Sequence, residues 1–162
     1  MKPVVCNASP LIAMAKAGLL ELLPILFYPF YVPRAVLEEI KAGPSDDPIR
    51  LQIDSLSWVQ QVIIKPPLSP LATWQLGAGE SEVIEFARTN NGVSAVLDDY
   101  QARKVAVALG IKVYGTLSVL ALAKNKGVID SFQEATSKLV AAGLYVSESL
   151  IEAVAKQLNE QV

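Results

Sequence analysis

The stretch "SAVLDDYQARKVAVALGIKVYG", from Ser94 to Gly115, predicts a strand, a helix and a second strand in succession. It begins and ends with short apolar runs, which are typical of buried strands. Between these runs, apolar residues recur at helical spacing from Asp99 to Leu109, and Gly110 follows as a helix terminator. Strands that are joined by a helical crossover lie parallel, so this stretch indicates an α/β fold.

Apolar runs and helical periods alternate along the rest of the chain as well. Further strands are predicted at "PVVC" near the N-terminus and at "WVQQVIIK" from Trp58. The predicted helices cover Pro10 to Ala17, Leu19 to Leu23, "YVPRAVLEEIKAG" with Pro33 near its start, Glu80 to Thr89 and Leu117 to Lys126. We therefore expect one domain over residues 1–162, with three α/β/α layers and a central, mainly parallel sheet.

Two capping-box patterns predict helices near the C-terminus. Ser131 is followed three residues later by Glu134, and Ser149 is followed in the same way by Glu152. We expect the C-terminal helices, over residues 131–160, to pack on the domain or on a partner chain.

Polar residues directly follow two of the predicted strands. Asn7 follows "PVVC", and Asp98 and Asp99 follow "SAVL". Ligands of an open parallel sheet bind beyond the carboxyl ends of its strands, although Asn and Asp are also common N-caps. Ser9, which precedes a proline, is the better cap of the first helix, and Asp98 can cap the later one, which leaves Asn7 and Asp99 for a site. An ion pair with Arg103 is the alternative role for Asp99.

Two glutamates lean towards the inner faces of their predicted helices. Glu80 precedes apolar residues by three, four and seven positions, and Glu39 follows an apolar residue by three. Each acid by itself is commonly a surface residue. Together with the strand-end residues they favour a shared cation, because a buried carboxylate needs a partner. The candidate ligands are Asn7, Glu39, Glu80 and Asp99.

The ligand types that the chain offers limit its chemistry. It has no histidine and one cysteine, Cys6, which excludes a Ser-His-Asp triad, a His-ligated zinc site and an internal disulfide. Oxygen ligands select a hard ion, Mg²⁺ or Mn²⁺. Such an ion activates water and stabilises charge on a phosphoryl group, so the predicted reaction is metal-dependent phosphodiester hydrolysis.

Charge and hydropathy bear on partners and location. A net charge of -2 provides no global field for a polyanion, so any contact with nucleic acid is local. For cations such as Arg103 and Lys104, a solvated helix face is favoured over a place beside an acidic groove that binds substrate. For aromatic residues such as Tyr100, a core or interface position is favoured over stacking on bases. No apolar run can span a bilayer and no signal peptide is evident, so we expect a cytoplasmic protein with no membrane contact. The apolar fraction of 52% is slightly high, which favours apolar surface that binds a partner protein or a second copy of the chain, as in a homodimer or a toxin-like complex.

The segments "NASPLIAMAKAGLLELL", "VPRAVLEEI", "LGAGESEVIEFA" and "LDDYQARKVAVALGIKVYGTLSVLALAKNKG" resemble PIN-domain proteins, in particular the VapC-like toxin ribonucleases. The resemblance covers almost the whole chain and implies Mg²⁺ or Mn²⁺ as the cofactor. The acidic positions of the family correspond, in order, to Asn7, Glu39, Glu80 and Asp99. Asp98 is the alternative for the last position, and Thr116 matches a hydroxyl near the metal, with a role as helix N-cap as its alternative.

This resemblance implies an endoribonuclease that cleaves single-stranded RNA and is the toxin of a toxin–antitoxin pair. Its expected partners are a cognate antitoxin and a second copy of the chain. Asn7 departs from the aspartate that the family usually has, and an amide oxygen can coordinate a cation but carries no charge. The alternative hypothesis is therefore a catalytically weak PIN domain that serves as a binding module for an antitoxin or a homodimer partner.

Overall fold

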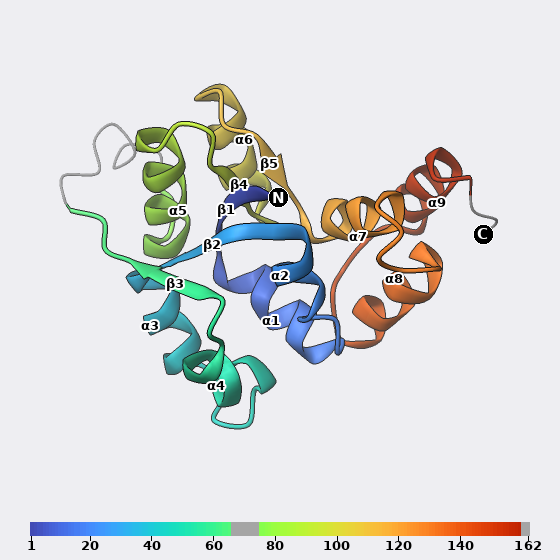
Figure 1. Ribbon diagram of the computed structural model, residues 1–162, viewed down its shortest axis with the longest axis horizontal. Helices are drawn as coiled ribbons and strands as arrows, with labels where there is room; N and C mark the ends of the chain where they lie inside the picture. Colours follow the sequence, from blue (N-terminus) through green and yellow to red (C-terminus); the bar gives the residue numbers. More distant parts are fainter. Residues whose placement is uncertain (66–74, 160–162) are drawn as a thin grey trace.

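A parallel β-sheet forms the centre of the molecule (Figure 1). The computed structural model describes residues 1–65 and 75–159, and within them the sheet has five strands in the order β3-β2-β1-β4-β5, with every pair parallel. The strands are β1 (Lys2–Cys6), β2 (Phe27–Pro33), β3 (Val59–Val62), β4 (Ser94–Val96) and β5 (Val113–Tyr114). The predicted parallel sheet is confirmed.

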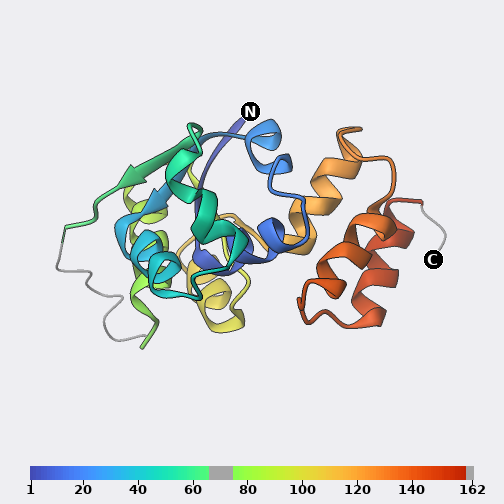
Figure 2. The same ribbon diagram turned by 90° about the horizontal axis from the view of Figure 1, so that it is seen from below.

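Helices cover both faces of this sheet, so the predicted three-layer α/β/α architecture is confirmed (Figures 1 and 2). Helix α5 packs against β1, β2 and β4 and also contacts α6, while α1 packs against α3 and α4. The helical elements are α1 (Ala8–Lys16), α2 (Leu22–Leu26), α3 (Arg34–Ala42), α4 (Pro48–Gln52), the 3-10 turn η1 (Ile53–Ser55), α5 (Ala78–Thr89), α6 (Tyr100–Ala108), α7 (Thr116–Asn125), α8 (Phe132–Ala141) and α9 (Glu148–Gln157).

The middle strands are buried on both faces, which explains why their sequences are apolar runs without alternation. Val4, Val5 and Cys6 of β1 are fully buried, and so are Ala95 and Val96 of β4. The two strands pair in register, with Cys6 opposite Val96. Their carboxyl ends therefore lie side by side, and the residues that follow them emerge at one edge of the sheet.

Strand β2 is the element that the sequence did not predict. Its residues "FYPFYVP" contain Pro29 and Pro33. The sequence pattern had assigned its last three residues, 31–33, to the following helix instead. A proline removes a ladder hydrogen bond and is tolerated in a strand mainly at its ends or at bulges. The register between β1 and β2 shifts between Lys2 and Val4, opposite the segment that contains Pro29, and this irregularity accommodates the proline.

The predicted starts of the first and last helices are wrong. The first helix begins at Ala8, before Ser9, with Asn7 at its N-cap position. Helix α9 is capped by Ser147, whose hydroxyl accepts a hydrogen bond from the Leu150 amide at 3.2 Å, and Ser149 lies inside the helix. Several serines near a helix start can all serve as caps, so the tertiary path of the chain decides which one does. The other predicted cap is confirmed, because Ser131 accepts from the Glu134 amide at 3.0 Å.

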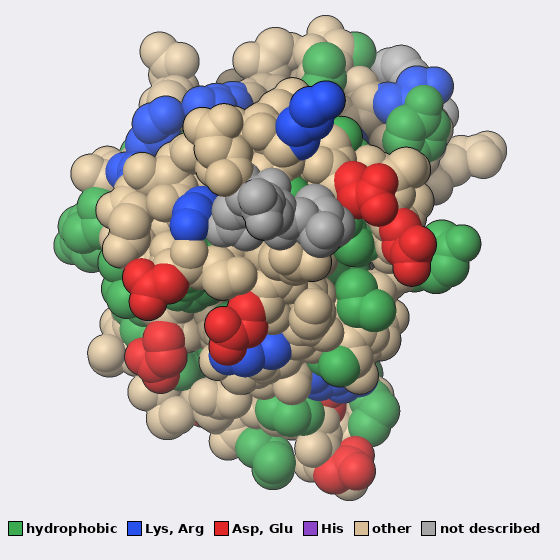
Figure 3. All heavy atoms as spheres, turned by 90° about the vertical axis from the view of Figure 1, so that its right-hand side faces the viewer, with side chains coloured by type: hydrophobic (Ala, Val, Ile, Leu, Met, Phe, Trp, Pro, Cys, Tyr) green, Lys and Arg blue, Asp and Glu red, His purple; other side chains and the backbone are tan. Residues whose placement is uncertain are grey.

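The C-terminal helices gather beside the sheet, at the right of Figure 1. Helix α8 packs on α1 and α7 and buries Phe132 and Leu139 completely, and α9 packs on α8. Residue 160, the last of the predicted C-terminal segment, lies outside the described residues. Hydrophobic, acidic and basic side chains are interspersed on the face that Figure 3 shows. None of the described helices has the length and apolar character needed to cross a membrane.

Candidate metal-binding site

Asn7 follows β1 and brings a buried polar atom to the carboxyl edge of the sheet. Its backbone amide donates to the carbonyl of Val96 at 3.1 Å, which fixes the residue beside the end of β4. The residue is only 2% exposed, and its Oδ1 accepts no hydrogen bond from any described residue. Although Asn7 stands at the N-cap position of α1, its side chain does not cap the helix. A buried acceptor without a donor costs about 1–3 kcal/mol, so Oδ1 calls for a cationic or proton-donating partner.

Gly79, in the first turn of α5, is the point at which three elements meet. A Cβ atom at Gly79 would lie 2.9 Å from Asn7 Oδ1 and 3.4 Å from Glu39 Oε2. Oxygens from β1 and α3 thus face the same small space, which stays open because Gly79 has no side chain. Sequence analysis did not single out this residue. A glycine inside a helix lowers the stability of that helix. The presence of Gly79 directly before the predicted start of this helix was therefore the sequence signal that other side chains approach the helix backbone closely.

Glu39 places a negative charge at this space, and Glu80 places a second charge that acts on Glu39. Partial burial raises the pKa of the Glu39 carboxyl, and the negative charge of Glu80 raises it further, although Glu39 as a whole residue is exposed. Glu80 is half-buried, and its Oε2 lies 2.5 Å from where a Cβ of Gly77 would be, against the start of its own helix. Within the described residues, neither carboxylate has an ion-pair partner.

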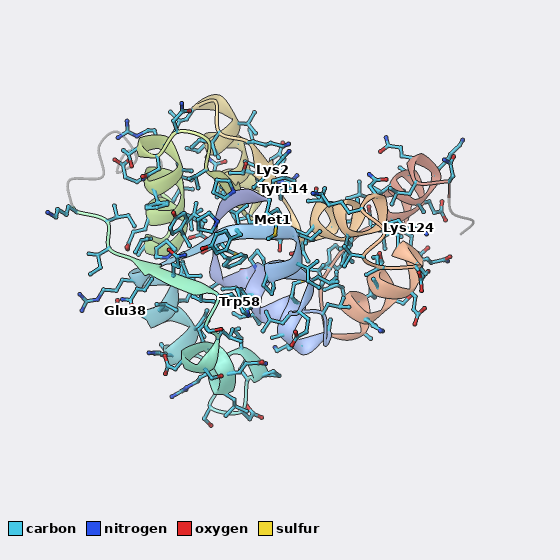
Figure 4. All side chains as sticks on the ribbon, in the orientation of Figure 1. Met1, Lys2, Glu38, Trp58, Tyr114 and Lys124 are labelled. Carbon is cyan, nitrogen blue, oxygen red and sulfur yellow. The ribbon has the colours of Figure 1, made fainter. Side chains whose placement is uncertain are left out.

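Glu38 and Glu39 are adjacent on α3, but their side chains point in different directions. Glu38 lies on the outer side of α3 (Figure 4), and its carboxylate pairs with Arg34 at 3.1 Å in solvent. Consecutive residues of a helix point about 100° apart, so Glu39 faces another direction from Glu38 and reaches Gly79. The predicted inward orientation of Glu39 agrees with this contact.

The two strand-end aspartates have roles opposite to those expected. Asp99 is the N-cap of α6, and its side chain accepts from the Ala102 amide at 2.9 Å. Asp98, which was expected to be this cap, instead turns towards α7 and accepts hydrogen bonds from the backbone amide and the hydroxyl of Thr116. Gly115, not Thr116, stands at the N-cap position of α7. The alternative role of Thr116 as an N-cap is therefore wrong as well.

Asp98 is the aspartate whose charge acts on the end of β1. Burial raises the pKa of the Cys6 thiol well above its usual value, and the negative charge of Asp98 contributes to the same shift. Cys6 precedes Asn7 directly, so the charge of Asp98 acts on the end of β1. The proximity follows from the pairing of β1 with β4 and could not be derived from spacing along the chain.

Gly115 makes room for a cation beside Asp98. A Cβ at Gly115 would lie 3.2 Å from Arg103 Nη1 and 3.4 Å from Asp98 Oδ1. The predicted alternative of an ion pair between Asp99 and Arg103 is not formed, and no described carboxylate lies within 4.0 Å of the Arg103 guanidinium. Asp98 and Arg103 line a cavity of about 540 Å³ that extends along α7 to α9.

Comparison with known families supports the fold and the broad chemistry. The chain matches a family described as a PIN domain over residues 3–160. The chain belongs to the PIN-domain family. PIN domains are generally nucleases, and they generally use divalent metal ions. No curated protein and no solved structure gave a significant match.

In this PIN domain the predicted ligands lie in two groups. Asn7 and Glu39 approach each other at Gly79, with the charge of Glu80 acting on Glu39, while Asp98 is held by Thr116 beside Gly115. Within residues 1–65 and 75–159, no three acidic or cysteine side chains stand close enough together to form a metal-binding group. The donor types nevertheless fit a hard divalent cation, because each is an oxygen and Asn7 Oδ1 accepts no hydrogen bond from the described residues. That a single cation joins both groups remains a prediction.

Proposed function

We propose that this PIN domain is a Mg²⁺- or Mn²⁺-dependent endoribonuclease for single-stranded RNA, and the toxin of a VapC-like toxin–antitoxin pair. The observation that carries the proposal is the Oδ1 of Asn7, which is buried beside the Glu39 carboxylate and accepts no hydrogen bond within the described residues. Glu39 and Glu80, whose charges act on each other, have no ion-pair partner there either. The resemblance to VapC-like sequences supports the choice of RNA and of an antitoxin as partner. A second copy of the chain is the other proposed partner.

In this proposal the residues at the edge of the sheet hold one divalent cation. Asn7 and Glu39 supply oxygens at Gly79, Glu80 supplies another from the first turn of α5, and an aspartate after β4 completes the set. A bound Mg²⁺ or Mn²⁺ lowers the pKa of a water molecule and stabilises the charge that develops on a phosphoryl group. The hydrogen bonds from Thr116 fix the carboxylate of Asp98 towards this edge, which limits its rotamers and orients it.

The hydrogen bonds of the two aspartates favour Asp98 over Asp99 as the fourth metal ligand. Sequence analysis preferred Asp99 because Asp98 was expected to be the cap, and the observed cap is Asp99. Asp98 is half-buried, lines the 540 Å³ cavity and acts on Cys6, whereas Asp99 is exposed. We therefore propose Asp98 as the metal ligand and Asp99 as the residue that starts α6.

A matched pair of substitutions tests this proposal. Asparagine is as good an N-cap as aspartate, so Asp99→Asn removes a charge without removing the cap. We expect Asp98→Asn to lower Mn²⁺-dependent cleavage of a single-stranded RNA at least about 100-fold, which is the usual scale for loss of a group that stabilises the transition state, and Asp99→Asn to stay within a few-fold of the wild type. EDTA and a double-stranded RNA serve as controls. Equal cleavage by wild type and Asp98→Asn would refute the assignment.

The second candidate function is a binding module without useful nuclease activity. It is favoured by the missing charge at Asn7 and by the absence of a compact group of three acids among the described residues. This candidate predicts no Mn²⁺-dependent cleavage by the wild type, together with a stable homodimer in light scattering. Cleavage that EDTA abolishes and Asp98→Asn removes would exclude it.

A further inference from the structure

Helix α6 carries an exposed strip that the proposed catalytic residues do not include. We call it the α6 strip: Tyr100, Arg103, Lys104 and Val107, which recur at spacings of three and four and so share one face of the helix. The apolar side chains of this strip are exposed to solvent, since Tyr100 is 74% exposed and Val107 is 64% exposed. Tyr100 therefore does not lie in the core, and its expected alternative place in an interface stays a prediction.

The strip combines an aromatic ring with two cations. The ammonium of Lys104 lies 5.4 Å from the centre of the Tyr100 ring. Among the residues that the structure describes, neither Lys104 nor Arg103 forms an ion pair with a carboxylate. A single-stranded polyanion that carries planar bases matches this combination, because its phosphates pair with cations and its bases stack on exposed rings.

Arg103 connects the strip to the candidate site. It lines a shallow hollow of about 560 Å³ together with Tyr100, Lys104 and Val107. It also lines the 540 Å³ cavity that contains Asp98. Its guanidinium lies over Gly115, next to the Asp98 carboxylate but beyond ion-pair distance. A ligand bound along α6 would therefore pass Arg103 before it reaches Asp98.

We propose that the α6 strip binds the single-stranded RNA on its way to the cleavage site, with Tyr100 stacking on a base and Arg103 binding the phosphate nearest Asp98. This inference rests on the proposed function and adds the residues that position the substrate. A protein partner is less favoured for this face, because interface cores are depleted in lysine and the strip places a lysine directly beside its ring.

Binding of a fluorescently labelled single-stranded RNA in EDTA tests the proposal without cleavage. We expect Tyr100→Leu to weaken binding about 10-fold or more, which is the scale of one base stacked on an aromatic ring, and Tyr100→Phe to bind like the wild type. Tyr28→Leu is the matched control, since Tyr28 is 57% exposed but lies near the start of β2, at the opposite end of the strands from the site. We expect Arg103→Gln to reduce the slope of log K against log salt by about 0.7, the value for one phosphate contact in a single strand, and Arg103→Lys to keep it.

The inference and the proposed function fail in different ways. If wild type and Asp98→Asn bind RNA equally but neither cleaves it in Mn²⁺, the nuclease proposal fails while an effect of Tyr100→Leu would still support the α6 strip. If the wild type cleaves RNA and Tyr100→Leu binds it as tightly as Tyr28→Leu does, the strip is refuted. A change in oligomeric state of Tyr100→Leu with unchanged RNA binding would instead assign this face to a protein interface and would also refute it.

Discussion

Replacing Asn7 by aspartate places a new negative charge in the most crowded part of the candidate site. Asn7 is 2% exposed, and its Oδ1 and Glu39 Oε2 lie 2.9 Å and 3.4 Å from the Cβ position of Gly79. The two oxygens are thus no more than about 6 Å apart, and with an effective dielectric constant of about 20 two unit charges at that distance repel by about 3 kcal/mol. Loss of hydration of the buried carboxylate adds to this cost.

The expected result without metal is a clear loss of stability. In EDTA, Asn7→Asp should lose about 3 kcal/mol or more of its free energy of unfolding. For a chain of this size that loss lowers Tm by about 6–12 °C, because each kcal/mol corresponds to about 2–4 °C. A melting curve followed by circular dichroism at neutral pH measures it.

Divalent ions should reverse most of this loss. An ion at about 100 times its Kd stabilises the folded state by about 2.7 kcal/mol, so saturating Mn²⁺ should raise the Tm of Asn7→Asp more than it raises that of the wild type. Asn7→Leu is the control of similar size, which removes the unpaired oxygen and should melt at or above the wild-type temperature while losing the response to Mn²⁺. The reasoning is refuted if Asn7→Asp melts like the wild type in EDTA, or if Mn²⁺ stabilises Asn7→Leu as much as it stabilises Asn7→Asp.

Three further changes test other parts of the structure. The raised pKa of Glu39 means that its ionised form destabilises the folded state. Glu39→Gln should therefore be more stable than the wild type in urea unfolding at neutral pH in EDTA. This difference in stability should disappear as the pH falls below the ordinary pKa of a glutamate. Gly79→Ala would force a Cβ to within 2.9 Å of Asn7 Oδ1, so thermal melting should show a loss of about 1–3 kcal/mol, and an unchanged Tm would contradict the close approach. Ser147→Ala should cost about 1 kcal/mol in urea unfolding through the lost cap, whereas Ser149→Ala should change stability by less than about 0.5 kcal/mol, and equal effects would contradict the observed start of α9.

Local patterns were enough to predict most of the sheet and its crossovers. The stretch from Ser94 to Gly115 forms β4, α6 and β5 as expected. A strand that is buried on both faces is apolar throughout, and a helix that packs on the sheet has apolar residues at helical spacing on one face. The prediction failed at β2, whose prolines are typical of an interruption. Pairing with β1 on one side, through an irregular register, and with β3 on the other makes that segment a strand.

Part of the candidate site could be predicted from the sequence, and part depended on the tertiary structure. Strand order along the chain was sufficient to place Asn7 and the Asp98–Asp99 pair at the carboxyl edge of the sheet. It was not sufficient to tell which aspartate caps α6, because both residues are good caps at adjacent positions. The hydrogen bonds from Thr116, 18 residues further along the chain, decide that Asp98 turns away from the helix.

The sequence by itself determined the α/β class, the parallel sheet and the exclusion of histidine and disulfide chemistry, since these depend on residue types and on short-range periodicity. Only the tertiary structure decided that Asn7 Oδ1 has no hydrogen-bond partner in the part of the chain that the structure describes, and that Gly79 and Gly115 open the space around the carboxylates. The direction of a side chain and the charges around it depend on contacts between segments that are far apart in the chain, and no local pattern records those contacts.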